Sequence, residues 1–406
     1  MRIVIAVLAA LCAAAADKPL YEAELVFPLE HWHNHSSSLV ELPDGDLLVC
    51  WYNGSGERTA DDVKIEAARR VKGGKEWGSR FTLADTPGFP DTNPILFVDS
   101  HKRLWLVWPV ILANRWETAL LKYRIASVYP RGGAPKWEVS DPLLFIPRNF
   151  TEKTQAITGP LLKSLAPGRL ADEVKQAHEQ AADKYASRMG WMPRVHPLQL
   201  PSGRILVPLY SDGFNFSLIA ITDDFGATWT TSEPIVSAGG VQPSLVRRRD
   251  GTLVAYMRDN GPAPKRVPVS ESKDDGITWS AVTDTDIPNP GTSLEVIALR
   301  DGTWVMVGND TEKGRHSLAV SLSDDEGKAW NWTRRLEFEP KGTSSFDYPS
   351  VIEARDGSIH VSYSYSLNYL PRNAPRRAIK HARFNSAWVK AAPEAQPARP
   401  AGHSPR

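Results

Sequence analysis

The chain has 406 residues, with 48 basic and 47 acidic side chains and a formal net charge of +1. This even balance gives no electrostatic basis for binding nucleic acid. The length allows two domains, but a repeat architecture would account for all of it as one.

Residues 1–16 have a basic start, a short apolar stretch and an alanine-rich end. This pattern predicts a secretory signal peptide cleaved near Ala16, and it is too short to span a membrane. No other long apolar run follows, so we expect no membrane span and a secreted or periplasmic protein. Cleavage would remove Cys12 and leave Cys50 as the last cysteine, so no internal disulfide is expected.

A motif of the form Ser/Thr-x-Asp-x-Gly-x-x-Trp recurs along the chain. Three clear copies and one degenerate copy end at Trp229, Trp279, Trp330 and Trp77 respectively. Two of the gaps between them are about 50 residues and one is about three times as long, a spacing typical of propellers and solenoids. We expect the aspartate to accept backbone N–H groups across a hairpin turn and the tryptophan to lie between neighbouring repeats.

A second motif consists of an apolar run, Asp-Gly or a related pair, and then alternating apolar residues. Its six copies lie at 42–48, 98–106, 200–206, 249–254, 300–305 and 355–361. Asp-Gly between strand-like runs predicts a β-hairpin, so six copies predict an all-β, six-bladed β-propeller. The expected blades are 33–82, 91–144, 193–235, 241–286, 290–336 and 346–384, within one domain at 17–390. The alternating segment 21–27 is expected to add a strand to blade six and close the ring.

Two segments do not follow the repeat. Residues 151–190, between blades two and three, have apolar side chains at helical spacing, which predicts a short α-helical insertion with one solid helix and a shorter one near 155–164. It could pack on the flank of the propeller or form a lid over the site. The tail at 391–406 is rich in proline and alanine and is expected to be disordered.

In a propeller, the residues just before each Asp-Gly hairpin converge on the central axis. These positions hold polar and ionisable side chains in every blade, which is typical of a binding or catalytic pocket. They are His33, Asn34, His35, Thr92, Asn93, Arg194, His196, Gln242, Ser293, Glu295, Asp347 and Tyr348.

With these repeats, the chain resembles the sialidase superfamily of bacterial neuraminidase repeat (BNR, or Asp-box) propellers, and the resemblance covers most of the mature chain. It implies a tyrosine nucleophile at Tyr348, eight residues before the last Asp-Gly. It implies carboxylate-binding arginines at Arg258 and Arg315, and an acid/base aspartate at Asp61 or Asp62 in the first blade.

Two positions depart from the family pattern. His35 stands where the family has its first arginine, and Gln242 stands where it has the glutamate that activates the tyrosine. Because a tyrosine needs a base to attack at neutral pH, Glu295 in the next blade is a candidate to replace that glutamate. Arg194, His196 and Asn93 complete the expected substrate-binding set.

Three functions remain open from the sequence. The first is a sialidase-type glycoside hydrolase that releases a terminal acidic sugar, since arginines bind carboxylates through bidentate hydrogen bonds. The second is a polysaccharide lyase acting on uronates, with His33, His35, His196, Tyr348 and Arg258 as its base, acid and carboxylate ligands. The third is a carbohydrate-binding propeller without catalysis.

The expected partner is a glycan or oligosaccharide, bound by a monomer without any cofactor. His31, His33 and His35 alternate along one strand, but no carboxylate is fixed beside them in the sequence, so no metal site is predicted.

Overall fold

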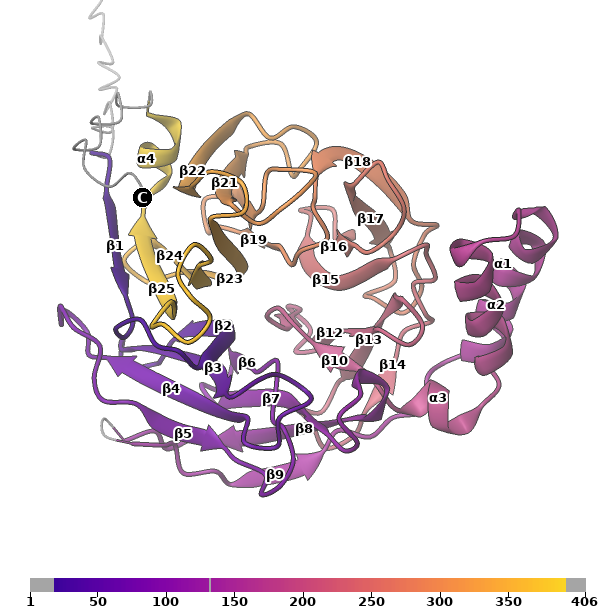
Figure 1. Cartoon of the computed structure of the whole chain (residues 1–406), viewed down its shortest axis with the longest axis horizontal. Coiled ribbons are helices and arrows are strands. Elements are labelled where there is room, and N and C mark those ends of the chain that lie inside the picture. The colour runs from indigo at the N-terminus through magenta and orange to yellow at the C-terminus, as the bar shows by residue number, and fades with distance from the viewer. Residues whose placement is uncertain (1–17, 131–132, 392–406) are drawn as a thin grey trace, which may run out of the picture.

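The computed structural model describes residues 18–130 and 133–391. The predicted signal peptide at 1–16 lies outside these residues, and so does the predicted tail apart from Ala391. The described chain forms six antiparallel sheets arranged in a ring around a central axis (Figure 1). The prediction of a mostly β, six-bladed propeller is confirmed.

The blades follow one another along the chain, each with its first strand innermost. Blade one contains β2 (His33–Glu41), β3 (Leu47–Gly54), β4 (Lys64–Arg70) and β5 (Phe81–Ala84). Blade two contains β6 (Ile95–Val98), β7 (Leu104–Ile111), β8 (Ala119–Ala126) and β9 (Val139–Pro142), with the short helix η1 (Trp116–Thr118) between β7 and β8. Blade three contains β10 (Met192–Pro193), β11 (Leu198–Gln199), β12 (Ile205–Ser211), β13 (Phe216–Thr222) and β14 (Thr230–Thr231).

The remaining three blades each have four strands. Blade four contains β15 (Gly240–Arg247), β16 (Leu253–Asp259), β17 (Arg266–Ser272) and β18 (Thr283–Pro288). Blade five contains β19 (Glu295–Ala298), β20 (Trp304–Gly308), β21 (Ser317–Ser323) and β22 (Trp332–Phe338). Blade six contains β23 (Ser344–Glu353), β24 (Ile359–Leu367) and β25 (Arg377–Phe384), with β1 (Tyr21–Leu25) as its fourth strand, and helix α4 (Ser386–Lys390) follows β25.

The ring is closed by the beginning of the described chain. Strand β1 (Tyr21–Leu25) pairs antiparallel with β25, with Tyr21 opposite Phe384 and Leu25 opposite Lys380. The Tyr21 ring also stacks on Trp388 at a centroid distance of 4.3 Å. The expected closure by segment 21–27 is therefore confirmed, and the outer edge of β25 is covered.

The repeated motif stabilises a hairpin turn through hydrogen bonds of its own side chains. In the copy that ends at Trp229, the Asp224 carboxylate accepts hydrogen bonds from the backbone N and the Oγ1 of Thr228, at 2.8 and 2.6 Å. Gly226 has a φ of +93°, which favours glycine, and its N–H donates to Thr222 Oγ1. The Trp229 ring then meets Trp105 and Tyr123 of the preceding blade edge to face, so the motif joins neighbouring blades as predicted.

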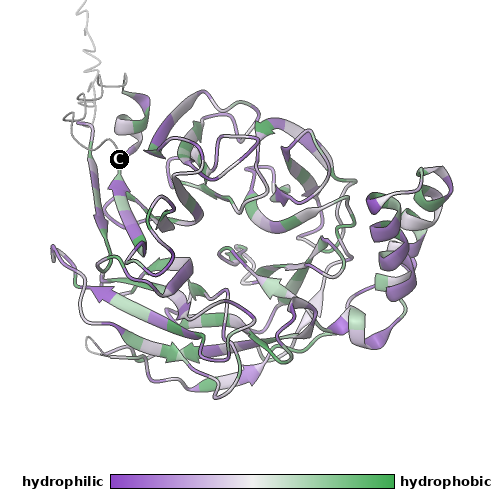
Figure 2. Cartoon of the chain, in the orientation of Figure 1, coloured by the Kyte–Doolittle hydropathy of each residue, from purple (hydrophilic) through white to green (hydrophobic). Residues whose placement is uncertain are grey.

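The core lies between blades rather than at the axis. The largest cluster of buried side chains combines residues of blades two and three, such as Trp105, Val107, Ile205 and Leu218. Figure 2 shows the hydrophobic residues mainly on the strands of the ring. Burial between sheets leaves the axis free to hold polar side chains.

Three helices lie between β9 and β10 in the chain: α1 (Phe150–Ser164), α2 (Arg169–Gln180) and α3 (Lys184–Arg188). The expected solid helix is divided between α2 and α3, and the expected shorter helix is the longest of the three. Figure 1 shows α1 and α2 outside the ring, away from its central opening, which contradicts the lid interpretation. Within the described residues, none of the helices has the length and apolar character needed to cross a membrane.

Candidate active site at the centre of the ring

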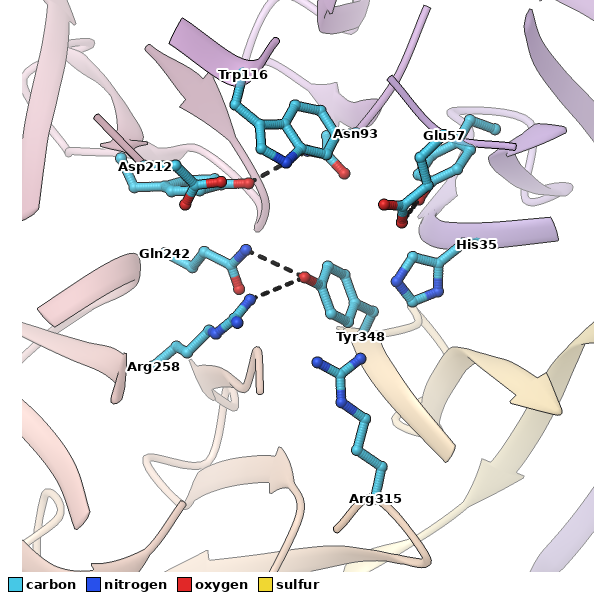
Figure 3. Close-up of a pocket in the computed structure, with 11 residues that line it drawn as sticks. His35, Glu57, Asn93, Trp116, Asp212, Gln242, Arg258, Arg315 and Tyr348 are labelled. Carbon is cyan, nitrogen blue, oxygen red and sulfur yellow. Dashed lines mark hydrogen bonds between the residues drawn. The ribbon is translucent and has the colours of Figure 1, made fainter. Parts of the chain in front are cut away.

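A polar pocket of about 320 Å³ opens at the centre of the ring, and every blade contributes to it (Figure 3). Its lining residues are His35, Tyr52, Glu57, Asn93, Trp116, Tyr210, Asp212, Gln242, Arg258, Arg315 and Tyr348. Six of these eleven were predicted as site residues: His35, Asn93, Gln242, Arg258, Arg315 and Tyr348.

β-Bulges in three innermost strands direct side chains toward this pocket. The pairing register shifts after His35 in β2, after Val241 in β15 and after Asp347 in β23. At these bulges Ser36, Gln242 and Tyr348 have φ of +57°, +54° and +54°, in the left-handed region that side-chain-bearing residues rarely adopt. A bulge that re-aims a side chain beside a functional site is a recurrent use of this irregularity.

Tyr348 lies at the centre of the pocket floor. Its hydroxyl oxygen accepts a hydrogen bond of 2.9 Å from Arg258 Nη1 and one of 3.4 Å from Gln242 Nε2. Both neighbours donate to the same oxygen, an arrangement that stabilises negative charge there. Gln242 cannot take up a proton, so it cannot do the work of the glutamate it replaces.

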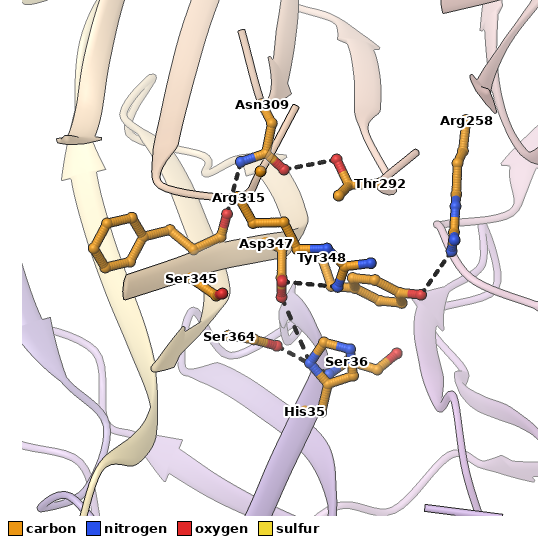
Figure 4. A network of polar contacts seen from close by, with 12 residues as sticks. His35, Ser36, Arg258, Thr292, Asn309, Arg315, Ser345, Asp347, Tyr348 and Ser364 are labelled. Atoms are coloured by element: carbon orange, nitrogen blue, oxygen red, sulfur yellow. Dashed lines mark hydrogen bonds and ion pairs between the residues drawn. The ribbon is translucent and has the colours of Figure 1, made fainter. Parts of the chain in front are cut away.

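Arg258 and Arg315 provide positive charge at the pocket surface. Arg258 forms no ion pair with any residue in the described part of the chain, and its Nε is buried without a hydrogen-bond partner there. Arg315 Nη1 pairs with Asp347 Oδ2 at 2.9 Å (Figure 4). Burial lowers the pKa of Arg315, but Asp347 outweighs it and the pKa is raised, so this group stays charged.

His35 is a neutral neighbour of the tyrosine. Its ring lies 4.2 Å from the Tyr348 ring by centroid, and its Nδ1 lies 3.6 Å from Asp347 Oδ1 (Figure 4). Burial, followed by the charges of His33 and the nearby arginines, lowers the pKa of His35 well below its usual value. At neutral pH this imidazole is therefore uncharged.

Arg194 and His196, predicted to bind substrate, do not line the pocket. The Arg194 side chain is buried, and its guanidinium carbon lies 4.7 Å from the centroid of the Tyr348 ring. Its Nη2 donates to the carbonyl of Pro349 at 3.2 Å. Arg194 therefore supports the tyrosine ring from below and does not face a ligand.

Glu295, predicted as a catalytic base, is also absent from the pocket. Its Oε1 lies 2.7 Å from His196 Nδ1 and accepts from the His196 backbone N, while its Oε2 accepts from Val351 N at 2.7 Å. His196 Nε2 in turn contacts the Leu39 carbonyl at 2.8 Å. This buried pair ties blades one, three, five and six together, and neither residue is among those that line the pocket, contrary to the expected placement.

The loop between β3 and β4 sends a different carboxylate into the pocket from the one predicted. Asp62 accepts hydrogen bonds from Ser55 N and Oγ within the loop, and Asp61 accepts one from Asn114 Nδ2. Neither lines the pocket, because both carboxylates are used to hold the loop. Glu57 of the same loop lines it instead.

Glu57 is an ionised group in a hydrogen-bonded setting. The Tyr52 hydroxyl donates to Glu57 Oε1 over 2.5 Å, and His33 Nε2 lies 3.7 Å from the same oxygen. Burial raises the pKa of Glu57, but His35, the Tyr52 hydrogen bond and His33 outweigh it and leave the pKa below its usual value.

Sequence reasoning missed five lining residues: Tyr52, Glu57, Trp116, Tyr210 and Asp212. All lie in second strands or in the loops that follow them, whereas the prediction considered mainly the first strands. Asp212 lies in an Asp-Gly turn directly after β12. The same dipeptide marks hairpins elsewhere in the chain, so nothing in the residue pattern indicates that this aspartate faces the axis.

Comparisons with known proteins agree with this fold. Residues 183–361 match the family model of the BNR repeat-like domain. An anhydrosialidase from Macrobdella decora is 27% identical over an alignment of 193 residues, and the match covers 42% of this chain. The chain spans only 24% of that relative's length in this match.

Solved structures are similar over most of the ring. The leech intramolecular trans-sialidase bound to 2,7-anhydro-Neu5Ac aligns with a TM-score of 0.67 at 14% identity, covering 91% of this chain and 71% of that one. The intramolecular trans-sialidase of Ruminococcus gnavus aligns with a TM-score of 0.64 at 15% identity, covering 89% of this chain and 96% of that one. A protein of unknown function from Dyadobacter fermentans gives 0.66 at 13% identity, covering 90% and 98%.

Proposed function

We propose that this chain, a sialidase-like BNR-repeat propeller, is a glycoside hydrolase that releases a terminal acidic sugar from a glycan. One observation carries this proposal: Arg258, which has no carboxylate partner in the described chain, donates to the Tyr348 hydroxyl inside a pocket that Arg315 also lines. A bound carboxylate would supply the missing anion.

The two arginines would orient the sugar. A planar guanidinium binds a carboxylate with two parallel hydrogen bonds, which fixes both its position and its rotation. A substrate carboxylate held by Arg258 and Arg315 would place its adjacent anomeric carbon near the Tyr348 oxygen. A neutral tyrosine is the suitable nucleophile beside such an anion, because a carboxylate nucleophile would be repelled by it.

The altered positions favour an acidic sugar other than the usual sialic acid. His35 is neutral, so the site has one permanent positive charge fewer than the family pattern at this position. A smaller positive field suits a substrate whose carboxylate is held by two arginines. A panel of acidic sugar substrates is therefore needed to identify the sugar and its linkage.

A lyase is the second candidate, because His35, Tyr348 and Arg258 line one pocket. A neutral imidazole can remove the proton next to a uronate carboxylate, while an arginine stabilises the charge that develops. His33 and His196, also considered for this reaction, do not line the pocket.

One assay separates these functions. Purified protein is incubated with aryl glycosides and oligosaccharides of N-acetylneuraminate, deaminated neuraminate and glucuronate. A free reducing acidic sugar supports the hydrolase, and an ultraviolet-absorbing unsaturated sugar supports the lyase. Binding without either product on the whole panel would leave a carbohydrate-binding propeller and refute both enzymes.

We also propose that the protein works outside the cytoplasm, as residues 1–16 suggest. N-terminal sequencing of the protein expressed in a host with an export pathway tests this. A mature chain that begins near Asp17 supports export, and an intact Met1 contradicts it.

A further inference from the structure

We propose that Asp212 is the general acid and base of this site, the group that protonates the glycosidic oxygen of the leaving group. The inference rests on the proposed glycoside hydrolase function. It assigns the proton transfer to blade three, at a residue outside the first-blade loop where the family pattern places an aspartate.

Asp212 is the pocket carboxylate that is free to meet a substrate. Of the carboxylates that line the pocket, Glu57 is bonded to Tyr52, whereas Asp212 has neither a hydrogen bond nor an ion pair with any described residue. Asp212 is an exposed residue and lines the pocket. Figure 3 shows Asp212 and Glu57 on opposite sides, with the Tyr348 hydroxyl between them.

The turn that carries Asp212 is held firmly. The Ser211 carbonyl accepts a hydrogen bond of 2.8 Å from Asn215 N. The Ser211 Oγ accepts a second one, of 3.3 Å, from Phe214 N. The Phe214 ring is buried and lies 5.0 Å from Phe150, the first residue of α1, and 6.2 Å from Trp191 by centroid. The carboxyl group is thus presented from a rigid support, as proton transfer to a bound substrate requires.

The electrostatic setting of Asp212 suits a proton donor. Removal of water by the surrounding pocket raises its pKa, Glu117 of η1 and Glu57 of the β3–β4 loop add to this, and Arg258 of β16 and Arg58 oppose it. The pKa of Glu57 across the pocket is lowered. Two carboxyl groups whose pKa values are shifted in opposite directions are a recurring sign of an acid beside an ionised partner.

The reaction would take place in two steps. The Tyr348 oxygen attacks the anomeric carbon and releases its proton to water, while Asp212 gives its proton to the glycosidic oxygen. That oxygen leaves with the electron pair of the broken bond. Water then attacks the same carbon, and the Asp212 carboxylate takes a proton from this water. The tyrosine oxygen leaves with the electron pair of its bond to the sugar and regains from the solvent the proton that it released in the first step.

Leaving-group dependence tests this assignment. The wild type and Asp212→Asn are compared on two substrates that carry the same acidic sugar. One is a nitrophenyl glycoside, whose leaving group departs with little protonation. The other is an oligosaccharide with this sugar at its end, whose leaving group must be protonated. We expect Asp212→Asn to lower the first-step rate by at least about 100-fold on the oligosaccharide and by less than about tenfold on the nitrophenyl glycoside. Azide should restore the second step and yield a glycosyl azide.

Two further variants make the result specific. Asp286→Asn, at an exposed position of β18, is the matched control and should behave as the wild type. In Glu57→Gln, the activity on the two substrates should fall by the same factor. The assignment is overturned if Asp212→Asn keeps its activity on both substrates, or if its activity on both falls by the same factor. It is also overturned if the leaving-group dependence appears in Glu57→Gln instead. A wild type inactive on every substrate refutes the hydrolase itself, and Asp212 with it.

Discussion

The Arg258 guanidinium donates to the Tyr348 hydroxyl over 2.9 Å, and this hydrogen bond joins blade four to blade six across the axis of the ring. Within the described residues, neither Arg258 nor Tyr348 has a hydrogen bond or an ion pair with a carboxylate. The pair thus combines an anion ligand with a nucleophile in one unit, and its two halves can be tested separately.

Removal of the tyrosine oxygen should abolish the chemistry and leave the pocket intact. We expect Tyr348→Phe to reduce kcat by at least about 1000-fold, because the nucleophile and the acceptor of two hydrogen bonds are lost together. Steady-state kinetics on the best substrate of the panel measures this. Tyr369→Phe, at an exposed position after β24, is the control. Turnover close to the wild type would refute the assignment of Tyr348.

Loss of the planar guanidinium should weaken binding of the acidic sugar. Arg258→Lys keeps the charge but loses the bidentate geometry, so we expect KM and the Kd of the free sugar to rise about tenfold or more. Isothermal titration with the free acid measures Kd. Arg249→Lys, on the exposed surface, should bind normally. Equal affinities in the two variants would show that the substrate carboxylate lies elsewhere.

Stability should fall on mild acidification because of buried histidines. Burial, then the charges of His381 and Arg383, lower the pKa of His360 from 6.5 to about 3. Below pH 6.5 the unfolded chain therefore takes up a proton that the folded chain refuses, and the unfolding free energy should drop by about 2 kcal/mol between pH 7 and pH 5 from this residue. Urea denaturation at both pH values, with His360→Gln as the comparison, measures the difference. An identical drop in the variant would contradict it.

Glu295 should matter for folding more than for catalysis. Loss of one partner of a buried ion pair leaves the other charge uncompensated, so we expect Glu295→Ala to lower the unfolding free energy by about 3–5 kcal/mol. Turnover per folded molecule should change far less than in Tyr348→Phe. Denaturation and active-site titration together measure both quantities. Normal stability with lost turnover would restore Glu295 as a catalytic base.

The helices outside the ring should influence the pocket through one aromatic contact. Phe150→Ala removes the ring against which Phe214 packs, so we expect a loss of about 3–5 kcal/mol in stability and a lower kcat from a displaced Asp212. Leu161→Ala, a partly exposed position in α1, is the control. Unchanged kcat in folded Phe150→Ala would separate the helices from the site.

The sequence predicted the ring because its signals are local and repeated. Each Asp-Gly hairpin and each box turn is stabilised by neighbouring residues, as in the bonds from Thr228 to Asp224. The register of the hairpins placed Tyr348, His35 and Gln242 at the axis, and the resemblance to the sialidase superfamily implied Arg258 and Arg315; all five line the pocket.

The misplaced residues depend on contacts between distant parts of the chain. Whether Glu57 or Asp62 enters the pocket is decided by which carboxylate the loop backbone captures, and that choice leaves no trace in residue spacing. Glu295 and His196 lie two residues further along their strands than the axis positions held by Gln242 and Tyr348 in other blades. They contact each other although they are 99 positions apart in the chain. Pairing of this kind is visible only in three dimensions.

The joining of β1 to β25 has a consequence for synthesis. Residues 21–25 leave the ribosome long before residues 377–384, with which they pair, so the last sheet cannot form until the later residues are made. At about 5–20 residues per second, this wait lasts on the order of tens of seconds. During that time five blades can fold in sequence while the sixth stays incomplete, so its unpaired strands would be the segment of the nascent protein most open to chaperones and to misassembly.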